Sequence, residues 1–196
     1  MNFLGHLFFS NDDTQLMHAN LYGDFIRGRD LSMYSPNLQK GIRIHREIDH
    51  YVDNHPEVRS LIHELYKPLP KVAGIAIDLY FDHVLAQKWN QYHEILLSQF
   101  VANFYDSDPH PREEYSTEYL FMFEKMRERN WLEKYQTMFG LTKACQGVSR
   151  RISFDNVLDQ APLIYDQFSE KIEKTFITFM EDAIPHHKSF LEGIPS

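Results

Sequence analysis

The sequence predicts an all-α fold, and two observations support this prediction. Apolar residues recur at helical spacing through most of the chain, and no stretch alternates polar and apolar residues for long. The dipeptides Asn-Gly and Asp-Gly, which mark tight β-hairpins, are absent. A chain of 196 residues is long enough to bury its own core, so we expect one helical domain over residues 1–196. Caps and breaks indicate around eight to ten helices.

Each expected helix begins at a capping residue or a proline. Asn2 would cap a short first helix, and the turn at residues 11–14 would start a second one that ends near Gly28. The pair Ser35-Pro36 would start a central helix that runs to about Asn54. Further helices are expected from 56 to the prolines at 68 and 70, and over about 71–92, 94–105, 117–129, 131–138, 141–151 and 156–182.

Composition narrows the class of protein. The formal net charge of -8 disfavours general nucleic-acid binding, which relies on many phosphate contacts from Lys and Arg. The single cysteine, Cys145, excludes a disulfide within the chain and a cysteine-based zinc site. No signal peptide and no apolar run of about 18 residues is apparent. We therefore expect a cytoplasmic protein with neither a nucleic-acid nor a membrane partner. The sequence carries no signal for its oligomeric state.

The central helix carries the first candidate ligands. In the stretch GIRIHREIDHYVDNHP, His45 and Asp49 are four residues apart and therefore lie on one face, one helical turn from each other. An imidazole and a carboxylate at this spacing can share one divalent cation. The alternative interpretation is a solvated polar face interrupted by aliphatic residues.

The helix expected over 71–92 is apolar on almost all sides, yet it contains charged residues. Asp78 and Asp82 lie one turn apart, and His83 follows directly. Two like charges at this spacing repel each other, so in a buried helix they require a cation. A metal ion or an arginine side chain would satisfy this requirement.

Two further polar residues lie in apolar surroundings. His6 lies in the apolar N-terminal segment, where a hydrogen-bonded core histidine is the alternative to a ligand. Asp24 lies among apolar residues, where a carboxylate is costly unless it is paired, and a salt bridge to Arg27 or Arg29 is the alternative to a metal. By contrast, we expect the histidines at 186 and 187 to lie in an exposed tail.

The candidate metal ligands share one chemistry: all are His or Asp, and none is a thiolate. They are His6, Asp24, His45, Asp49, Asp78, Asp82 and His83. Nitrogen and oxygen ligands of this kind suit Mn²⁺, Mg²⁺, Fe²⁺ or Zn²⁺. A helical protein that gathers such ligands is suited to metal-assisted hydrolysis of phosphate esters, in which the metal polarises a phosphoryl oxygen and lowers the pKa of bound water.

Several segments together resemble one known family, the acyl carrier protein phosphodiesterases. They are MNFLGHL, NLYGDFIRGR, GIRIHREIDHYVDNHPEVR, DLYFDHVLAQKW and GVSRRI, which are spread over nearly the whole chain. The resemblance implies hydrolysis of the 4'-phosphopantetheine arm from holo acyl carrier protein. It also implies the helical fold of the HD-type metal-dependent phosphohydrolases, of which this family is regarded as a divergent branch.

The resemblance also implies site residues in the first half of the chain. His6 matches the His of the N-F-L-x-H-L pattern, and Asp24 matches the Asp of the x-D-F-x-R-G pattern. His45 and Asp49 match the H-R-x-I-D element, and Asp53 matches the D-x-x-P element that follows.

A third element, D-x-x-x-D-H, matches Asp78, Asp82 and His83. An ordinary HD protein has adjacent His and Asp in that order, whereas here Asp82 precedes His83. The order of the motif therefore does not assign the metal ligands, and Asp78 is equally suited to orient a ligand histidine.

The resemblance implies a mechanism that uses Mn²⁺, with Mg²⁺ or Fe²⁺ as alternatives. The catalytic residues would be Asp24, His45, Asp49 and His83, with His83 protonating the serine oxygen that leaves on the carrier protein. Arginines at 27, 43, 46 and 150 would bind the substrate and stabilise charge on the phosphate oxygens. Because acyl carrier proteins are acidic, a local basic patch is expected at Arg27, Arg29, Lys40, Arg43 and Arg46.

Two other functions remain open from the sequence. An HD-like phosphohydrolase acting on a small nucleotide or phosphomonoester would use the same metal site without a docking patch. A non-enzymatic helical binding module would let the His and Asp residues satisfy one another, and it would bind no metal.

Overall fold

Helices provide all the regular secondary structure in the part of the chain that the computed structural model describes, residues 1–194. The α-helices are α1 (Phe3–Phe8), α2 (Thr14–Tyr22), α3 (Pro36–Asn54), α4 (Pro56–Leu65), α5 (Ala73–Gln87), α6 (Leu97–Tyr105), α7 (Thr117–Glu128), α8 (Trp131–Lys134), α9 (Met138–Ser149) and α10 (Ala161–Gly193). Short 3-10 turns occur at η1 (Gly23–Phe25), η2 (Trp89–Gln91), η3 (Arg112–Glu114) and η4 (Leu158–Gln160). The predicted all-α fold is confirmed.

The predicted helix starts are confirmed where a side chain caps the helix. The side chains of Asn2, Asp13 and Ser35 each accept a hydrogen bond from a backbone N–H in the first turn of α1, α2 and α3. Four predicted ends are wrong. Helix α5 stops at Gln87 and α8 at Lys134, before the expected ends at about 92 and 138. Helix α2 stops at Tyr22, because the chain tightens there into η1, and α10 continues to Gly193 through Pro185.

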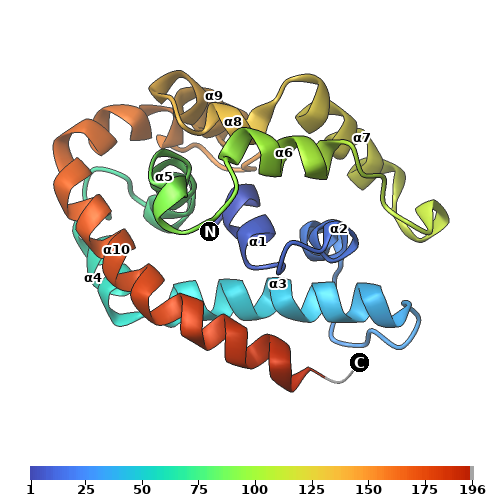
Figure 1. The fold of residues 1–196 in the computed structure, drawn as a ribbon. Coiled ribbons are helices and arrows are strands. Elements are labelled where there is room, and N and C mark those ends of the chain that lie inside the picture. Colours follow the sequence, from blue (N-terminus) through green and yellow to red (C-terminus); the bar gives the residue numbers. More distant parts are fainter. Residues whose placement is uncertain (195–196) are drawn as a thin grey trace.

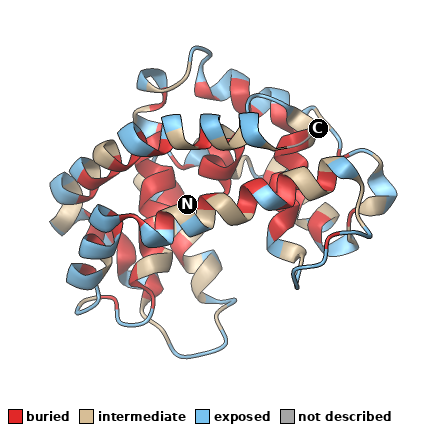
Figure 2. Ribbon diagram, turned by 90° about the horizontal axis from the view of Figure 1, so that it is seen from below, coloured by how far each residue is buried: buried red, intermediate tan, exposed pale blue. Residues whose placement is uncertain are grey.

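Helix α1 lies at the centre of the molecule, with α2 and α5 packed against it (Figure 1). Helix α3 packs along α2, and α10 wraps around one side, where it contacts α9, α5, α4 and α3 (Figure 1). Figure 2 shows buried positions on the inward faces of the outer helices and over most of the central ones. The first helix is therefore held by elements from distant parts of the sequence.

Because α10 is longer than expected, one histidine that the sequence predicted in an exposed tail lies in the core. His187 is buried and packs against the aromatic rings of Phe9 and Tyr51. The expectation of an exposed tail is wrong for this residue, because α10 continues past Pro185 and keeps one face on the core.

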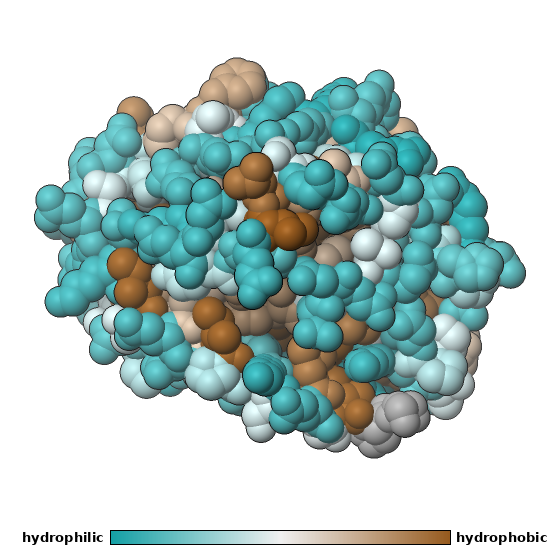
Figure 3. Space-filling view, viewed as in Figure 1, coloured by the Kyte–Doolittle hydropathy of each residue, from teal (hydrophilic) through white to brown (hydrophobic). Residues whose placement is uncertain are grey.

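The outer surface is mainly polar. Figure 3 shows hydrophilic side chains over most of one face, with apolar side chains visible in a few places. Among the described residues, no helix combines the length and the apolar composition that a bilayer-spanning segment needs.

The closest approach between α2 and α3 depends on a glycine. A Cβ atom added at Gly41 would lie 2.3 Å from the Cβ atom of Ala19 and 2.5 Å from its backbone carbonyl carbon. Backbone atoms cannot move aside as a flexible side chain can, so only glycine fits at this crossing. This contact fixes α3, and with it His45 and Asp49, against α2.

Gly41→Ala should therefore destabilise the fold, although alanine normally favours a helix over glycine by about 1 kcal/mol. We expect the free energy of unfolding to fall by about 1–3 kcal/mol. Gly147→Ala in α9 is the matched control, since a Cβ atom there meets nothing within 4 Å. Urea denaturation of both variants measures the difference. Equal stability of Gly41→Ala and Gly147→Ala would contradict the close-packing argument.

A second buried histidine should make stability depend on pH. His18 is fully buried, with its Nδ1 atom 2.7 Å from the Tyr119 hydroxyl oxygen and its Nε2 atom 3.0 Å from the Ser107 Oγ atom. Burial lowers the pKa of His18 from its usual value of 6.5 to about 4. Between these two pH values the unfolded chain binds a proton that the folded chain does not bind.

We therefore expect the free energy of unfolding to fall as the pH drops from 6.5 towards 4, with His18 contributing about 1.4 kcal/mol per pH unit. His18→Gln should be less stable at pH 7, because hydrogen bonds are lost, but its stability should fall less steeply towards acid. Urea denaturation at several pH values tests this. Parallel curves for the two proteins would show that His18 does not cause the slope.

Candidate active site

A buried carboxylate holds the first helix in place. Asp82 of α5 accepts hydrogen bonds from the backbone N–H groups of Asn2, Leu4 and Gly5 at 3.2, 2.7 and 3.0 Å. These groups belong to the start of α1, where backbone donors have no partner within the helix. Burial raises the pKa of Asp82 to about 7, while the amides and the Met1 ammonium favour its charged form.

The Met1 ammonium lies beside the same helix start. It donates a hydrogen bond to Asp78 Oδ1 at 2.8 Å. Burial of the ammonium lowers its pKa, but the charge and hydrogen bond of Asp78 together with the charges of Asp49 and Asp82 outweigh this effect, so the net pKa is raised. Asp78 and Asp82, one turn apart on α5, are thus both engaged with the N-terminal segment.

Two buried imidazoles meet where α1 crosses α3. The rings of His6 and His45 are stacked, with centroids 4.3 Å apart and an angle of 22° between their planes. Asp49 bridges them: its Oδ1 atom lies 3.2 Å from His6 Nε2, and its Oδ2 atom lies 3.3 Å from His45 Nε2. Asp24 of η1 approaches the same His45 Nε2 atom at 3.4 Å. The sequence-predicted pair His45 and Asp49 therefore joins residues from two other elements.

A glycine lets η1 reach this cluster. A Cβ atom at Gly23 would lie between 2.4 and 2.7 Å from three atoms of the His45 side chain. Only a residue without a side chain allows the backbone to pass this close to the imidazole. Asp24, the next residue, is thereby placed beside His45.

Acceptor atoms surround the His6 ring. Asn20 donates through Nδ2 to the His6 carbonyl oxygen and to Ser10 Oγ, which directs its Oδ1 atom to His6 Nδ1 at 3.0 Å. His6 Nε2 faces two further acceptors, the Met1 carbonyl oxygen at 3.1 Å and the Asp49 carboxylate. A neutral imidazole has only one N–H group to donate, so it cannot satisfy all of these acceptors. The remaining acceptors favour an additional positive charge beside the ring.

The pKa values of the cluster reflect the opposing effects of burial and of neighbouring charges. Burial favours the neutral form of Asp49, but the hydrogen bond and the charge of His6 outweigh it and lower the pKa of Asp49 to about 2. The pKa of Asp24 is lowered in the same way by His45, against the effect of burial. Burial lowers the pKa of His6, and the neighbouring His45 lowers it further. Ionised carboxylates thus lie beside His6, an imidazole that resists protonation.

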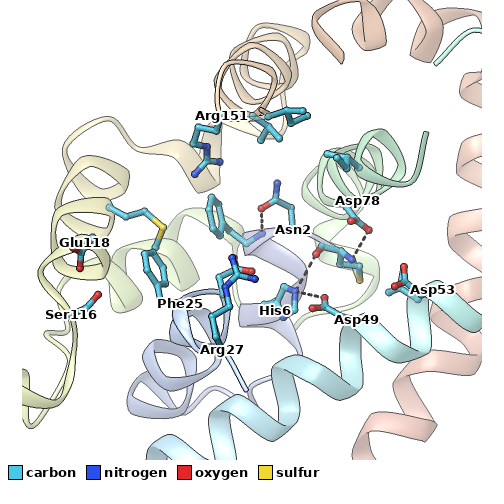
Figure 4. Close-up of a pocket in the computed structure, with 18 residues that line it drawn as sticks. Asn2, His6, Phe25, Arg27, Asp49, Asp53, Asp78, Ser116, Glu118 and Arg151 are labelled. Carbon is cyan, nitrogen blue, oxygen red and sulfur yellow. Dashed lines mark hydrogen bonds and ion pairs between the residues drawn. The ribbon is translucent and has the colours of Figure 1, made fainter. Parts of the chain in front are cut away.

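The cluster opens into a cavity of about 900 Å³ between α1, α3, α5, α7 and α9. Figure 4 shows His6 and Asp49 at its floor, Asp53 and Asp78 on one side, and Arg27 and Arg151 reaching towards it from other elements. The side chains of Asp24 and Asp49 are 57% and 47% exposed, so a ligand in the cavity can reach both carboxylates.

The residues of this cluster fit a divalent cation. Side-chain atoms of His6, His45 and Asp49 all lie within 4.8 Å of one another, the one such His, Cys and acidic group found among residues 1–194. A cation that binds its ligands at about 2.1 Å holds neighbouring ligand atoms roughly 3 Å apart. The spacings of 3.2 and 3.3 Å from Asp49 to the two imidazoles are close to that value. A cation would also supply the positive charge that the acceptors around His6 require.

The structure separates three of the seven predicted ligands from this cluster. Asp78 lines the cavity but is paired with the Met1 ammonium, and Asp82 is turned towards the start of α1. His83 does not line the cavity: its Nδ1 atom lies 2.5 Å from the Tyr135 carbonyl oxygen, and its ring packs on Tyr165. Adjacent residues of a helix point about 100° apart, so Asp82 and His83 face different neighbours.

The predicted substrate-binding arginines also occupy different places. Arg27 lines the cavity, whereas Arg150 lines a neighbouring groove along α8 and α9. Arg46 donates a hydrogen bond to the Gly28 carbonyl oxygen at 2.7 Å and thus supports the loop after η1. Arg43 is exposed and lines neither space.

Sequence reasoning did not assign a role to Asn20, Gly23 or Arg151. Asn20 lies four residues before Asp24, a helical spacing that could have suggested a supporting role. Gly23 and Arg151 carry no such local signal, because their importance comes from contacts between distant segments.

Comparison with known proteins identifies relatives over nearly the whole chain. The sequence profile described as acyl carrier protein phosphodiesterase matches residues 1–183. Proteins named acyl carrier protein phosphodiesterase from Salmonella dublin, Salmonella agona (strain SL483) and Salmonella newport (strain SL254) are each 30% identical over 186 residues, which cover 91% of this chain and 93% of theirs. No solved structure matches the chain. The resemblance noted in the sequence is confirmed, and the chain belongs to the acyl carrier protein phosphodiesterase family.

Proposed function

We propose that this chain is a metal-dependent hydrolase that releases 4'-phosphopantetheine from holo acyl carrier protein and leaves the apo carrier protein. Family membership supports the substrate, since the curated relatives carry the name of this activity. The convergence of His6, His45 and Asp49 from two helices, open to a large cavity, is the observation that carries the chemistry.

The charge of the cavity explains why a cation is part of the proposal. Five carboxylates line it, those of Asp24, Asp49, Asp53, Asp78 and Glu118. An anionic phosphodiester would be repelled by these groups in a space partly shielded from water. A divalent cation, for which we propose Mn²⁺ with Mg²⁺ or Fe²⁺ as alternatives, supplies charge that attracts phosphate oxygens and lowers the pKa of bound water.

The chain's own residues then have distinct roles. His6, His45 and Asp49 hold the cation, and Asp24 orients His45 and is positioned to bind a water molecule at the cavity wall. Arg27 and Arg151 lie on other walls of the cavity, where their guanidinium groups can bind phosphate oxygens of the substrate. Asn20 fixes the orientation of the His6 ring through Nδ1.

We propose a different proton donor to the leaving serine oxygen from the one that the motif suggested. His83 lies outside the cavity, whereas Asp53 lines it. Burial raises the pKa of Asp53, and the negative charges of Asp78 and Asp49 raise it further. Because Asp53 lines the cavity and its pKa is raised, we propose it for this role.

The direct test is intact-mass analysis of holo acyl carrier protein incubated with the purified protein and Mn²⁺. We expect the mass of the apo form to appear, with released phosphopantetheine, and a chelator to stop the reaction. His45→Gln should abolish cleavage. His83→Gln is the matched control, because it also replaces a buried histidine but leaves the cluster intact.

The outcomes separate the three candidate functions. Bound metal without cleavage of the carrier protein would favour a phosphohydrolase for small phosphoesters. Absence of both metal and cleavage would favour a binding module in which the histidines and carboxylates only satisfy one another.

A second prediction tests the proton donor. Asp53→Asn should lower kcat by about 10²- to 10⁴-fold, the usual contribution of a general acid, with a smaller effect on KM. Steady-state kinetics with holo acyl carrier protein measure both constants. A larger loss in His83→Gln than in Asp53→Asn would reverse the assignment.

A third prediction tests the cation site without measuring activity. In Gly23→Ala the added methyl group must displace the His45 ring, so the affinity for Mn²⁺ should fall at least tenfold. Calorimetric titration with Mn²⁺ measures this, and Gly147→Ala serves as the control. Unchanged Mn²⁺ affinity in Gly23→Ala would show that His45 is not a ligand.

A further inference from the structure

A second groove, of about 650 Å³, runs along α8 and α9 next to the cavity. The two spaces share part of their lining, including Asn2, Val148 and Arg151, so they meet at the side of α9. Figure 4 shows Arg151 above Asn2 at this junction. A molecule lying in the groove would therefore reach the mouth of the cavity.

The groove concentrates positive charge on a protein whose net charge is -8. Its exposed cations are Arg129, Lys134, Lys143, Arg150 and Arg151. Within the described part of the chain, none of these five forms an ion pair with a carboxylate. The acidic residue on the rim, Glu128, is already paired with Lys125 at 2.6 Å. The charge is therefore free to attract an anionic partner.

Aromatic side chains accompany these cations. Phe139 is 62% exposed beside the groove, with the Lys143 ammonium 5.4 Å from the centre of its ring. Trp131 lies on the same lining and is partly buried. An exposed aromatic side chain near arginines is typical of a protein-binding surface.

The proposed reaction requires a docking surface next to the mouth of the cavity. The phosphodiester joins the arm directly to a side-chain oxygen of the carrier protein, so the folded carrier must lie against the cavity mouth during cleavage. The other walls of the mouth carry three carboxylates, those of Asp24, Asp53 and Glu118, and one arginine, Arg27. The groove along α8 and α9 is the neighbouring surface where cations prevail.

We infer that the α8–α9 groove is the surface on which the acidic carrier protein docks, with its arm passing Arg151 into the cavity. This inference rests on the proposed function, because it names the surface that the substrate of that reaction would use. It differs from the basic patch expected at Arg27, Arg29, Lys40, Arg43 and Arg46, of which Lys40 lines a different pocket against α10 and Arg46 supports a loop. Electrostatic attraction would guide the carrier protein and orient it on the groove.

The test measures binding of apo acyl carrier protein, which carries no phosphodiester and so binds without turnover. We compare the wild-type protein with Lys134→Glu/Lys143→Glu in the groove. The matched control is Lys174→Glu/Lys188→Glu, which reverses two exposed lysines of α10 outside both spaces. Unfolding midpoints of all three proteins show that each is folded.

We expect the groove variant to weaken binding by about 10- to 100-fold at low salt, and the control to stay within about twofold of wild type. Added salt should weaken wild-type binding far more than it weakens binding by the groove variant. Equal affinity of the groove variant and the control, or no saturable binding by the wild-type protein, would overturn the docking surface.

Cleavage of the holo carrier protein is measured in parallel, so that the two proposals fail separately. Binding through the groove without cleavage would keep the docking surface and reject the proposed reaction. Cleavage with the same KM in wild type and the groove variant would keep the reaction and reject the docking surface.

Discussion

The carboxylate of Asp82 under the start of α1 is the interaction on which the rest of the site depends. It satisfies three backbone donors at once and lies fully buried on α5. A buried charge without these partners would be strongly unfavourable, so α1 and α5 hold each other in one arrangement. Because α1 carries His6 and leads to α2, this contact also sets where His6 meets α3 (Figure 1).

The cluster at the floor of the cavity is rigidly supported and carries the negative charge of its carboxylates. Asn20 orients His6, Gly23 lets η1 approach His45, and Gly41 brings α3 against α2. The result places ionised carboxylates beside His6, an imidazole that resists protonation. Because the site is already held in place, the proposed cation would require little reorganisation of it to bind.

Charge is divided between the cavity and its surroundings. Carboxylates gather where a cation would bind, and unpaired cations gather along α8 and α9. An acidic protein would be attracted to the groove and would reach the acidic cavity only through its arm. In the proposed complex, this division would allow a protein with a negative net charge to receive a negatively charged partner.

The sequence by itself determined the features that depend on the spacing of residues within one helix. Helical periodicity and the caps at Asn2, Asp13 and Ser35 predicted the all-α fold and several helix starts, and the four-residue spacing of His45 and Asp49 placed them side by side. Only the tertiary structure decided which residues from different helices meet. It joined His6 and Asp24 to that pair and turned Asp82 and His83 towards other neighbours, because the direction in which a side chain points into the core depends on how the helices cross.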